Sequence, residues 1–395
     1  MKNIEPSATV TLPTLETPIH REQFDIQLVE MRCVAPIEFA RPFYDATMGP
    51  FTSYRACFVR LTDRSGAWGE CEFPATATDL LRHVFVSLLL ETPKNTYEEL
   101  YRKLYWGIRN EGFRGGAALA LGHLDRIFHD LAARRKGVPL FRYLGGRSPR
   151  VRAYASGGGI HLTGSELVDE CLAWEAQGYT TIKIKFGSLT TTVKEDLVRI
   201  TSVREALRSE TQLAIDANQS MSLPKAQKLS QALGSLDIAW LEEPIHSAAL
   251  HEIEALCAHS PIPISYGESE RSALVFPSLV RAGVKHMQPI AGHISSLHEW
   301  LSVANLARRH ELTFSGGGTS HINASALAVV GGEALLEYLE PVVGVMASLL
   351  RVGPTVQDGY FTVPEVPGIG AEVDWERLEK KKQIVDRAVW KNDDQ

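Results

Sequence analysis

The chain has 395 residues, of which 44% are hydrophobic, and its 41 Lys and Arg against 47 Asp and Glu leave a net charge of −6. Because these charges are spread along the chain without a basic block, we do not expect nucleic acid as a main partner. No stretch approaches the roughly 18 continuous apolar residues of a membrane-spanning helix, so no membrane partner is expected either. The length suits one large α/β domain with a second, smaller one.

The N-terminal residues 1–17 are polar, contain Pro and Thr, and lack the apolar core of a signal peptide. We therefore expect a loose arm over residues 1–20. No two of the five cysteines stand at CxxC spacing, so neither a zinc site nor a disulfide framework is expected. This cysteine usage favours a reducing, cytoplasmic location.

The region 1–150 predicts an α+β domain. Residues 24–34 and 54–73 have strand character, and the turn at residues 63–66 interrupts the second of them. Over residues 115–137 apolar side chains recur every three or four positions, which predicts a helix that ends near Gly137.

From about Val151 onwards, short apolar strands alternate with amphipathic helices, which indicates parallel strands with crossover helices. Seven or eight such units fit a closed (β/α) barrel over residues 151–353 better than an open sheet, because the GxGxxG sequence typical of many open sheets does not occur. The tail, residues 354–395, lacks the barrel pattern and is expected to pack back on the first domain. The strands are expected at residues 153–159, 180–187, 212–219, 238–244, 263–269, 284–290, 312–318 and 339–345.

Three acidic residues, Asp216, Glu242 and Glu268, stand at predicted strand ends, and 26 residues separate each from the next. One βα unit of a barrel has about this length, so the three carboxylates should meet at the carboxyl-terminal rim, where barrel active sites form. Converging carboxylates repel one another unless a cation joins them, and oxygen ligands suit Mg²⁺. One such residue alone is more often a helix cap, but three at equal spacing favour a metal site. Lys183 and Lys185 share one face of the preceding strand and would face the same cavity.

These motifs resemble the enolase superfamily, close to its mandelate racemase and muconate lactonizing enzyme branch. The sequences KIK, DAN, EEP and GES match that family in order and spacing, and VPLFRYLGG and VPEVPGIGAEV match family landmarks outside the site. The resemblance covers nearly the whole chain. It implies a modified (β/α)8-type barrel, (β/α)7β, over residues 151–353. An α+β capping domain would be formed by residues 1–150 together with the C-terminal segment 354–395.

By this resemblance Asp216, Glu242 and Glu268 bind Mg²⁺. Lys185 would remove a proton from the carbon next to a substrate carboxylate, and Lys183 would lower the pKa of Lys185 and help to hold that carboxylate. The resemblance also implies a homo-oligomer, either a dimer or an octamer.

Further candidates for substrate binding come from the DAN motif and from the capping region. Asn218 belongs to the motif. In the family the loop after the first strand closes over the substrate, which makes Arg41 and Tyr44 candidates here, with a surface role for each equally open. Arg114 is a weaker candidate.

The chain departs from the family pattern at the second catalytic group. The sixth strand of the family ends in Asp or Lys and the seventh in His, whereas the matching positions here are Ile290 and Gly316. His321 and His293 are possible replacements, and a metal-bound water or a hydroxyl group is another. The hydroxyl candidates are Ser315, Thr319 and Ser320, and His286 and His298 are expected to be structural.

Loss of the second catalytic group limits the reactions that the site can catalyse. Racemization needs a proton-transfer group on each face of the substrate, whereas elimination of water needs one base and a proton for the departing hydroxide. We therefore favour a lyase that dehydrates an acid sugar (an aldonate or aldarate) to a 2-keto-3-deoxy product. The alternatives are a racemase, epimerase or cycloisomerase acting on another carboxylate, and a family member that has lost its chemistry and binds a metabolite.

Overall fold

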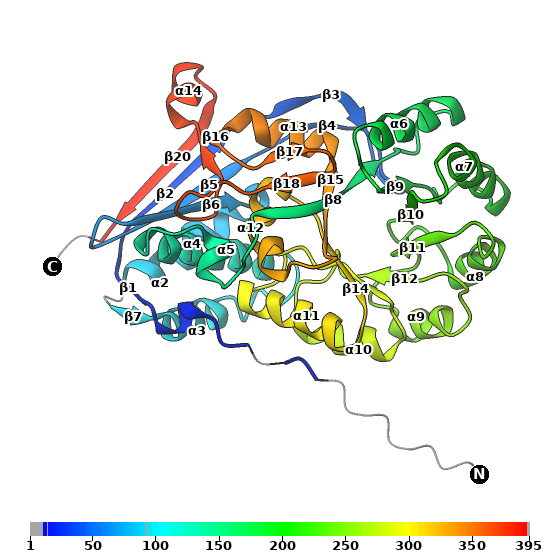
Figure 1. Cartoon of the computed structure of the whole chain (residues 1–395). Coiled ribbons are helices and arrows are strands. Elements are labelled where there is room, and N and C mark those ends of the chain that lie inside the picture. Colours follow the sequence, from blue (N-terminus) through cyan, green and yellow to red (C-terminus); the bar gives the residue numbers. More distant parts are fainter. Residues whose placement is uncertain (1–10, 14, 92–93, 393–395) are drawn as a thin grey trace, which may run out of the picture.

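The computed structural model describes residues 11–13, 15–91 and 94–392 (Figure 1). Residues 1–10, half of the predicted arm, lie outside the described residues. The arm does not extend to residue 20, because a 3₁₀ helix, η1 (Pro18–Arg21), places Ile19 fully buried in the hydrophobic core. In the described part of the chain, no helix has the length and apolar character needed to cross a membrane.

Eight parallel strands form a closed barrel, which confirms the predicted fold class. Each strand pairs with the next, and the eighth, β15, pairs with the first, β8. The strands are mostly buried along their length, which explains their apolar character in the sequence. They are β8 (Arg150–Gly157), β9 (Thr181–Lys185), β10 (Gln212–Asp216), β11 (Ile238–Glu242), β12 (Ile264–Tyr266), β13 (His286–Met287), β14 (Thr313–Gly316) and β15 (Leu335–Leu339).

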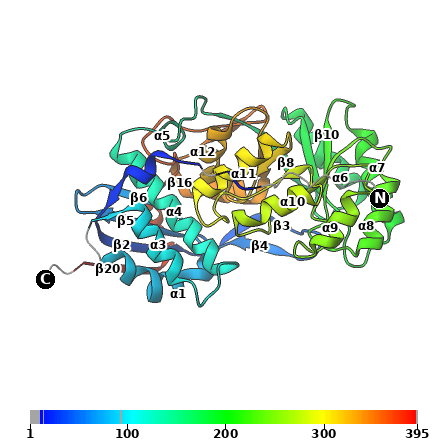
Figure 2. The ribbon, with the colours of Figure 1, turned by 90° about the horizontal axis from the view of Figure 1, so that it is seen from below.

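Helices follow these strands and surround the barrel (Figures 1 and 2). The first two begin at capping boxes, in which Thr163 pairs with Glu166 and Thr192 with Glu195. The helices are α6 (Gly164–Ala176), α7 (Val193–Ala206), α8 (Leu223–Ala232), α9 (Leu250–Cys257), α10 (Phe276–Arg281) with the preceding η4 (Ala273–Val275), α11 (Leu297–Arg309), α12 (Ser320–Val330) and α13 (Glu340–Leu349).

The strand predicted over residues 339–345 is wrong. The eighth strand ends at Leu339, and the following Val-rich segment is helix α13, with Pro341 in its first turn. Proline is favoured there because the first helical N–H groups have no partner within the helix. The run of β-branched residues suggested a strand, but helical packing on strand β3 (Ile37–Phe43) overrides that preference.

The capping domain contains an antiparallel sheet in the order β20-β2-β5-β6, in which the C-terminal strand β20 lies beside β2. Helix α4 packs so closely on this sheet that a Cβ at Gly69 would lie 2.4 Å from the Ile127 carbonyl oxygen. The elements of the N-terminal part are β1 (Gln23–Phe24), β2 (Ile26–Val34), β3, β4 (Phe51–Tyr54), β5 (Cys57–Asp63), β6 (Trp68–Phe73), η2 (Ala75–Ala77), α1 (Thr78–Leu80), η3 (Leu81–Phe85), α2 (Val86–Leu90), β7 (Asn95–Thr96), α3 (Tyr97–Gly107), α4 (Gly116–Arg135) and α5 (Leu140–Tyr143).

The C-terminal segment contributes to both parts of the molecule. Strand β18 pairs with the start of β8, whereas β20 completes the capping sheet. Its elements are β16 (Leu350–Val352), β17 (Thr355–Gln357), β18 (Tyr360–Thr362), β19 (Glu372–Val373), α14 (Trp375–Lys380) and β20 (Ile384–Lys391).

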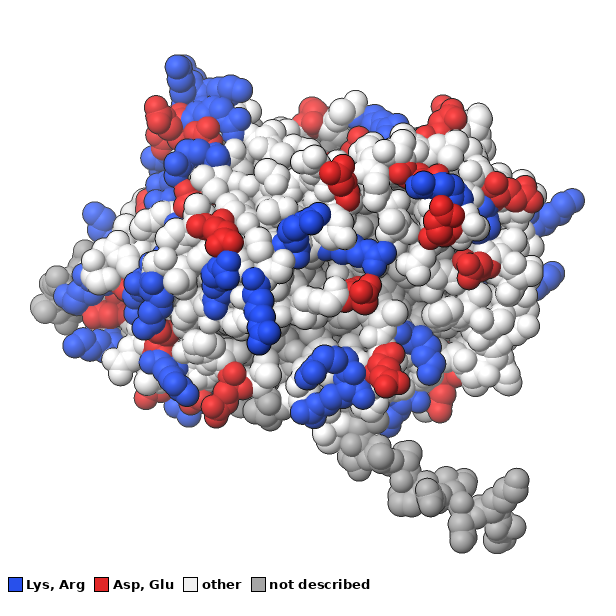
Figure 3. All heavy atoms as spheres, viewed as in Figure 1, with Lys and Arg blue, Asp and Glu red and all other residues white. Residues whose placement is uncertain are grey.

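One disulfide joins Cys33 and Cys57, which face each other across the β2–β5 pair. The sequence analysis expected no disulfide framework and did not anticipate this bond, which forms because strand pairing brings together two cysteines that are 24 residues apart in sequence. The inference of a reducing location loses this support. On the face of the molecule shown in Figure 3, acidic and basic side chains are intermixed, without a continuous basic stripe.

Candidate active site

Strand register places the lysines and carboxylates side by side at the mouth of the barrel. Lys185 on β9 is the register partner of Asp216 on β10, which in turn is the register partner of Glu242 on β11. Glu268 follows two residues after the end of β12. Ligand oxygens of Asp216, Glu242 and Glu268 all lie within 4.8 Å of one another.

Lys183 is almost completely buried and is surrounded by carboxylates. Its Nζ lies 2.9 Å from Glu242 Oε1, 3.0 Å from Glu337 Oε1 and 3.5 Å from Asp216 Oδ2. Lys185, also buried, donates a hydrogen bond to Asp216 Oδ2. A buried ammonium group requires such partners, so the unusual lysine pair is balanced by the acidic groups around it. We call these four residues, Lys183, Lys185, Asp216 and Glu242, the lysine wall.

Burial and neighbouring charges shift the pKa values of this cluster. Burial is the largest single influence on the pKa of Lys185 and lowers it, but the carboxylates of Asp216, Glu268 and Glu242 together outweigh burial and the repulsion from Lys183, so the net pKa is raised. Lys183 thus lowers the pKa of Lys185, as predicted, but the net pKa of Lys185 does not fall below its usual value. Burial raises the pKa of Glu268 to about 7 and holds that of Glu242 well above its usual value.

The donor set fits a hard divalent cation. The buried Asp216 and Glu242 and the half-buried Glu268 supply only oxygen ligands. Burial is the chief cause of the raised pKa values of Glu242 and Glu268, so a bound cation would relieve an unfavourable environment. Asp216, Glu242 and Glu268 would hold the cation.

Glu337 is a member of the site that the sequence analysis missed. It lies on β15, is 7% exposed and contacts Lys183 directly. The misplaced eighth strand concealed it, because the prediction began that strand at residue 339. An acidic residue inside the apolar run at residues 334–339 was the available signal.

Two further polar residues position the ligands. Glu243, also missed, accepts hydrogen bonds from the Ser269 N–H at 3.1 Å and from Gln219 Nε2 at 2.6 Å, which fixes the loop that carries Glu268. The Asn218 N–H donates to Asp216 Oδ1 at 2.9 Å, and Asn218 Oδ1 accepts from the Ala46 N–H of the capping domain at 3.2 Å. Asn218 therefore links Asp216 to the capping domain.

A cavity of about 200 Å³ opens beside Glu268 and Glu337, between the barrel and the capping domain. Its lining contains polar side chains from both parts of the molecule. The lining residues are Tyr54, His123, Arg126, Glu268, Ile290, Gly292, His293, Gly318, Thr319, Asn323, Glu337, Leu339 and Val342.

Ile290, which the sequence analysis placed opposite the lysines, lines this cavity. A network of hydroxyl groups lies where the cavity meets the capping domain. Thr319 Oγ1 donates to the buried Glu72 at 2.5 Å, Tyr54 also hydrogen-bonds to Glu72, and the two hydroxyl oxygens lie 3.2 Å apart. Burial raises the pKa of Glu72. We call Tyr54, Glu72, Ile290 and Thr319 the cap-facing wall. Gly316, at the end of β14, presents no side chain.

The two histidine candidates have different locations. His293 lines the cavity, and its Nδ1 donates to the Glu268 backbone oxygen at 3.3 Å. Burial and Arg271 hold the pKa of His293 well below its usual value. His321 is not brought to the site: it lies in the first turn of α12, and its ring packs edge-on against Phe361.

The remaining candidates also differ in whether they line the cavity. Thr319 lines the cavity, whereas Ser320 Oγ donates to the Glu337 backbone oxygen and Ser315 is buried in β14. His286 and His298 are outside the cavity lining. His286 packs on Trp240 at a ring distance of 4.3 Å, and His298 packs among aromatic rings of the capping domain.

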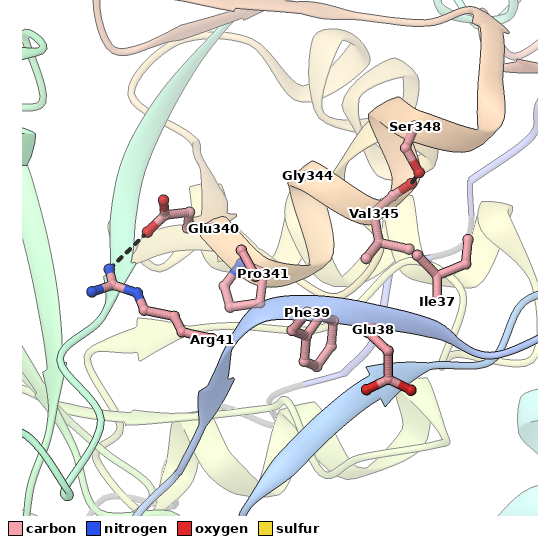
Figure 4. A pocket seen from close by; sticks show the side chains of 10 residues that line it. Ile37, Glu38, Phe39, Arg41, Glu340, Pro341, Gly344, Val345 and Ser348 are labelled. Carbon is pink, nitrogen blue, oxygen red and sulfur yellow. Dashed lines mark hydrogen bonds and ion pairs between the residues drawn. The ribbon is translucent and has the colours of Figure 1, made fainter.

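Arg41 and Tyr44 lie near the rim but outside the cavity lining. Arg41 forms ion pairs with Glu170 at 2.6 Å and with Glu340 at 3.3 Å, the second of which is seen in Figure 4. The Tyr44 ring packs on His161 at 4.5 Å. Arg114 is exposed. The structure therefore does not bring these three side chains to the acidic cluster.

Comparison with known proteins gives consistent similarities. Residues 166–377 match the family model described as "Enolase C-terminal domain-like". The chain is 27% identical to 3,6-anhydro-alpha-L-galactonate cycloisomerase of Streptomyces coelicolor, over 85% of this chain and 93% of that protein. It is also 27% identical to L-talarate/galactarate dehydratase of Salmonella typhimurium, over 72% of this chain and 70% of that protein.

Among solved structures, a racemase from Streptomyces coelicolor with bound magnesium superimposes with a TM-score of 0.83. It is 26% identical to this chain, and the match covers 91% of this chain and 100% of that one.

Proposed function

Because the chain belongs to the enolase C-terminal domain-like family, within the enolase and mandelate racemase superfamily, we propose that it is an Mg²⁺-dependent enzyme that removes the proton next to the carboxylate of an acid sugar. The single observation that carries this proposal is the lysine wall: two buried ammonium groups in contact with carboxylates that can hold a cation. The relatives, which include acid-sugar dehydratases and cycloisomerases, support the same substrate class.

The leading reaction is dehydration. Lys185, in its neutral form, takes the proton from the carbon next to the carboxylate, and Lys183 holds that carboxylate by its charge. A cation held by Asp216 would offset the carboxylate charge that raises the pKa of Lys185 and so would favour that neutral form. A proton α to a carboxylate is weakly acidic, and Asp216, Glu242 and Glu268 would hold a divalent cation, which would stabilise the negative charge left when this proton is removed. The hydroxyl group on the next carbon then departs as water, and the resulting enol becomes a 2-keto-3-deoxy acid.

The departing hydroxide needs a proton, and the cap-facing wall offers one. The hydroxyl groups of Tyr54 and Thr319 line the cavity and are joined to the buried carboxyl group of Glu72. Burial raises the pKa of Glu72 and so favours its protonated form. Thr319, one of the hydroxyl candidates from the sequence, thus becomes the favoured donor in place of His321.

Cycloisomerization is the second candidate, because two relatives, matched over 85% and 89% of this chain, are cycloisomerases. It would use the same base and the same cation. The protein would then rearrange a lactone or anhydro sugar acid without release of water.

A turnover assay in D₂O distinguishes these reactions. The purified protein with Mg²⁺ is incubated with a panel of aldonates, aldarates and their lactones, and products are followed by NMR. Dehydration is expected to yield a 2-keto-3-deoxy acid. An isomer of unchanged composition would instead support cycloisomerization, and deuterium in recovered substrate of inverted configuration would support epimerization. No turnover anywhere in the panel contradicts the proposal and favours a metabolite-binding protein.

A further inference from the structure

Arg126 on helix α4 is buried in the wall of the candidate cavity without a protein partner. It is 2% exposed and lines the cavity. Within the described ranges no carboxylate lies at ion-pair distance from its guanidinium, and Nη2 has no hydrogen-bond partner. A buried charge without a partner is costly, so this arrangement calls for an anion from outside the protein.

Close backbone packing fixes the position of Arg126. A Cβ at Gly122 would lie 2.2 Å from the Ile294 carbonyl oxygen, and a Cβ at Gly292 would lie 2.7 Å from Arg126 Nη1. Asp125, the neighbour of Arg126, accepts a hydrogen bond from the Leu297 N–H at 2.7 Å. Helix α4 is thus held against the loop after β13, which directs the guanidinium to the cavity.

The groups beside Arg126 do not neutralise it. His123 Nδ1 donates to the Glu72 backbone oxygen at 2.7 Å, and burial together with Arg126 lowers the His123 pKa to about 3, so this ring is neutral. Glu72 interacts with Arg126 electrostatically but not at ion-pair distance, and its carboxyl group, whose pKa burial raises, is already engaged by Tyr54 and Thr319.

A second unpaired polar group faces the same cavity. Asn323 is 1% exposed, and its Oδ1 has no hydrogen-bond partner, although its Nδ2 donates to the Gly317 carbonyl oxygen at 2.5 Å. A cavity that combines an unpaired donor with an unpaired acceptor suits a ligand that carries both an anionic group and hydroxyl groups. At about 200 Å³, the cavity is below the roughly 300 Å³ at which pockets for drug-sized ligands begin, so the ligand is small.

We propose that Arg126 binds a second carboxylate at the far end of the substrate, so that the substrate is an aldarate (a sugar diacid) rather than an aldonate. The lysine wall and Glu268 hold one end of the molecule, Arg126 pairs with the other, and Asn323 accepts a hydrogen bond from a hydroxyl group between them. This inference rests on the proposed function, which it narrows from acid sugars to diacids.

The test compares matched pairs of substrates that differ only at the far end, such as galactarate and galactonate, across a set of sugar configurations. For the wild type, the best aldarate is expected to exceed its matching aldonate in kcat/KM. Arg126→Gln is expected to lower kcat/KM for aldarates on the order of 100-fold, because it removes a buried ion pair with the substrate. For aldonates, the same variant is expected to change kcat/KM less than about threefold. Arg126→Lys should recover part of the aldarate activity.

Two measurements separate substrate recognition from folding. Removing an unpaired buried charge should not destabilise the free protein, so Arg126→Gln should melt at or above the wild-type temperature. In the Lys185→Ala background, calorimetric titration with galactarate and Mg²⁺ should show binding that Arg126→Gln weakens. The control Arg142→Gln, at an exposed residue paired with Glu365, should alter neither result.

The outcomes distinguish the two proposals. If the wild type turns over no acid sugar, the proposed function fails, and the Arg126 site is then judged by the titration alone. Turnover with equal losses for aldarates and aldonates in Arg126→Gln, or with no loss for either, overturns the Arg126 inference and leaves the proposed function standing. A lower melting temperature for Arg126→Gln with equal loss for both substrates would show that Arg126 serves folding.

Discussion

The two sides of the candidate active site are built in different ways. The lysine wall comes from three consecutive parallel strands, whose register alone places Lys185 beside Asp216 and Asp216 beside Glu242. The cap-facing wall joins β4, β6 and the loops after β13 and β14, which are far apart in the sequence. The first wall carries paired charges and the second carries hydroxyl groups around one buried carboxyl group. On the proposed function, this difference would assign proton removal to the barrel and proton supply to the boundary with the capping domain.

The difference in role between the two walls is tested most directly at Lys185. Lys185→Ala should lower kcat on the best acid sugar by about 10³-fold or more, because a positioned base contributes roughly 10²- to 10⁴-fold. Initial rates measure the effect, and Lys194→Ala, at an exposed lysine on α7, is the control. Full activity of Lys185→Ala would remove the lysine wall from the chemistry.

The metal ligands can be tested separately from the lysines at Glu268, which forms no ion pair with either lysine in the described structure. Loss of a residue that only hydrogen-bonds to a metal ligand weakens metal binding roughly 10- to 100-fold. Because Glu268 is itself a proposed ligand, Glu268→Gln should weaken Mg²⁺ binding by more than this. Calorimetric titration with Mg²⁺ is the measurement. Glu270→Gln, two residues away, should retain wild-type affinity, and an equal loss in both variants would contradict the assignment of Glu268.

The role of the cap-facing wall is sharpened by removing its hydroxyl groups. Tyr54→Phe and Thr319→Val should each lower kcat by about 10- to 100-fold with little change in KM, since proton supply acts on the reaction step. The matched control is Thr313→Val at the other end of β14, where the hydroxyl only contacts the Lys285 backbone oxygen. Unchanged kcat in both variants would mean that the Lys185 side supplies the second proton.

The smallest effect is expected at Arg41. Its ion pairs with Glu170 and Glu340 are at the surface, and such pairs contribute about 0–1 kcal/mol. Arg41→Ala should therefore change kcat/KM less than about threefold and the free energy of unfolding by at most about 1 kcal/mol. Kinetics and urea unfolding test this, and a large rise in KM would restore Arg41 as a substrate-binding residue.

The sequence predicted one wall of the site far better than the other. Equal spacing of Asp216, Glu242 and Glu268 predicted the acidic cluster, because a barrel repeats one strand per unit of nearly constant length, and the shared face of the preceding strand predicted Lys183 and Lys185 beside it. Glu337 was missed because the Val-rich segment after it suggested a strand where a helix forms. Glu72 and Arg126 gave no signal, since each is a single charged residue within an otherwise ordinary strand or helix of the capping domain.

The sequence by itself predicted the barrel and the set of acidic residues suited to a cation, because these depend on periodicity and on spacing along one chain, whereas the capping domain and the role of Lys185 were implied by the family resemblance. Only the tertiary structure decided which groups lie opposite these residues across the site. The packing of α4 against the loop after β13 placed Arg126 in the cavity, and the β2–β5 pairing joined Cys33 to Cys57. Such contacts depend on side-chain packing between distant segments, and no local pattern in the sequence encodes them.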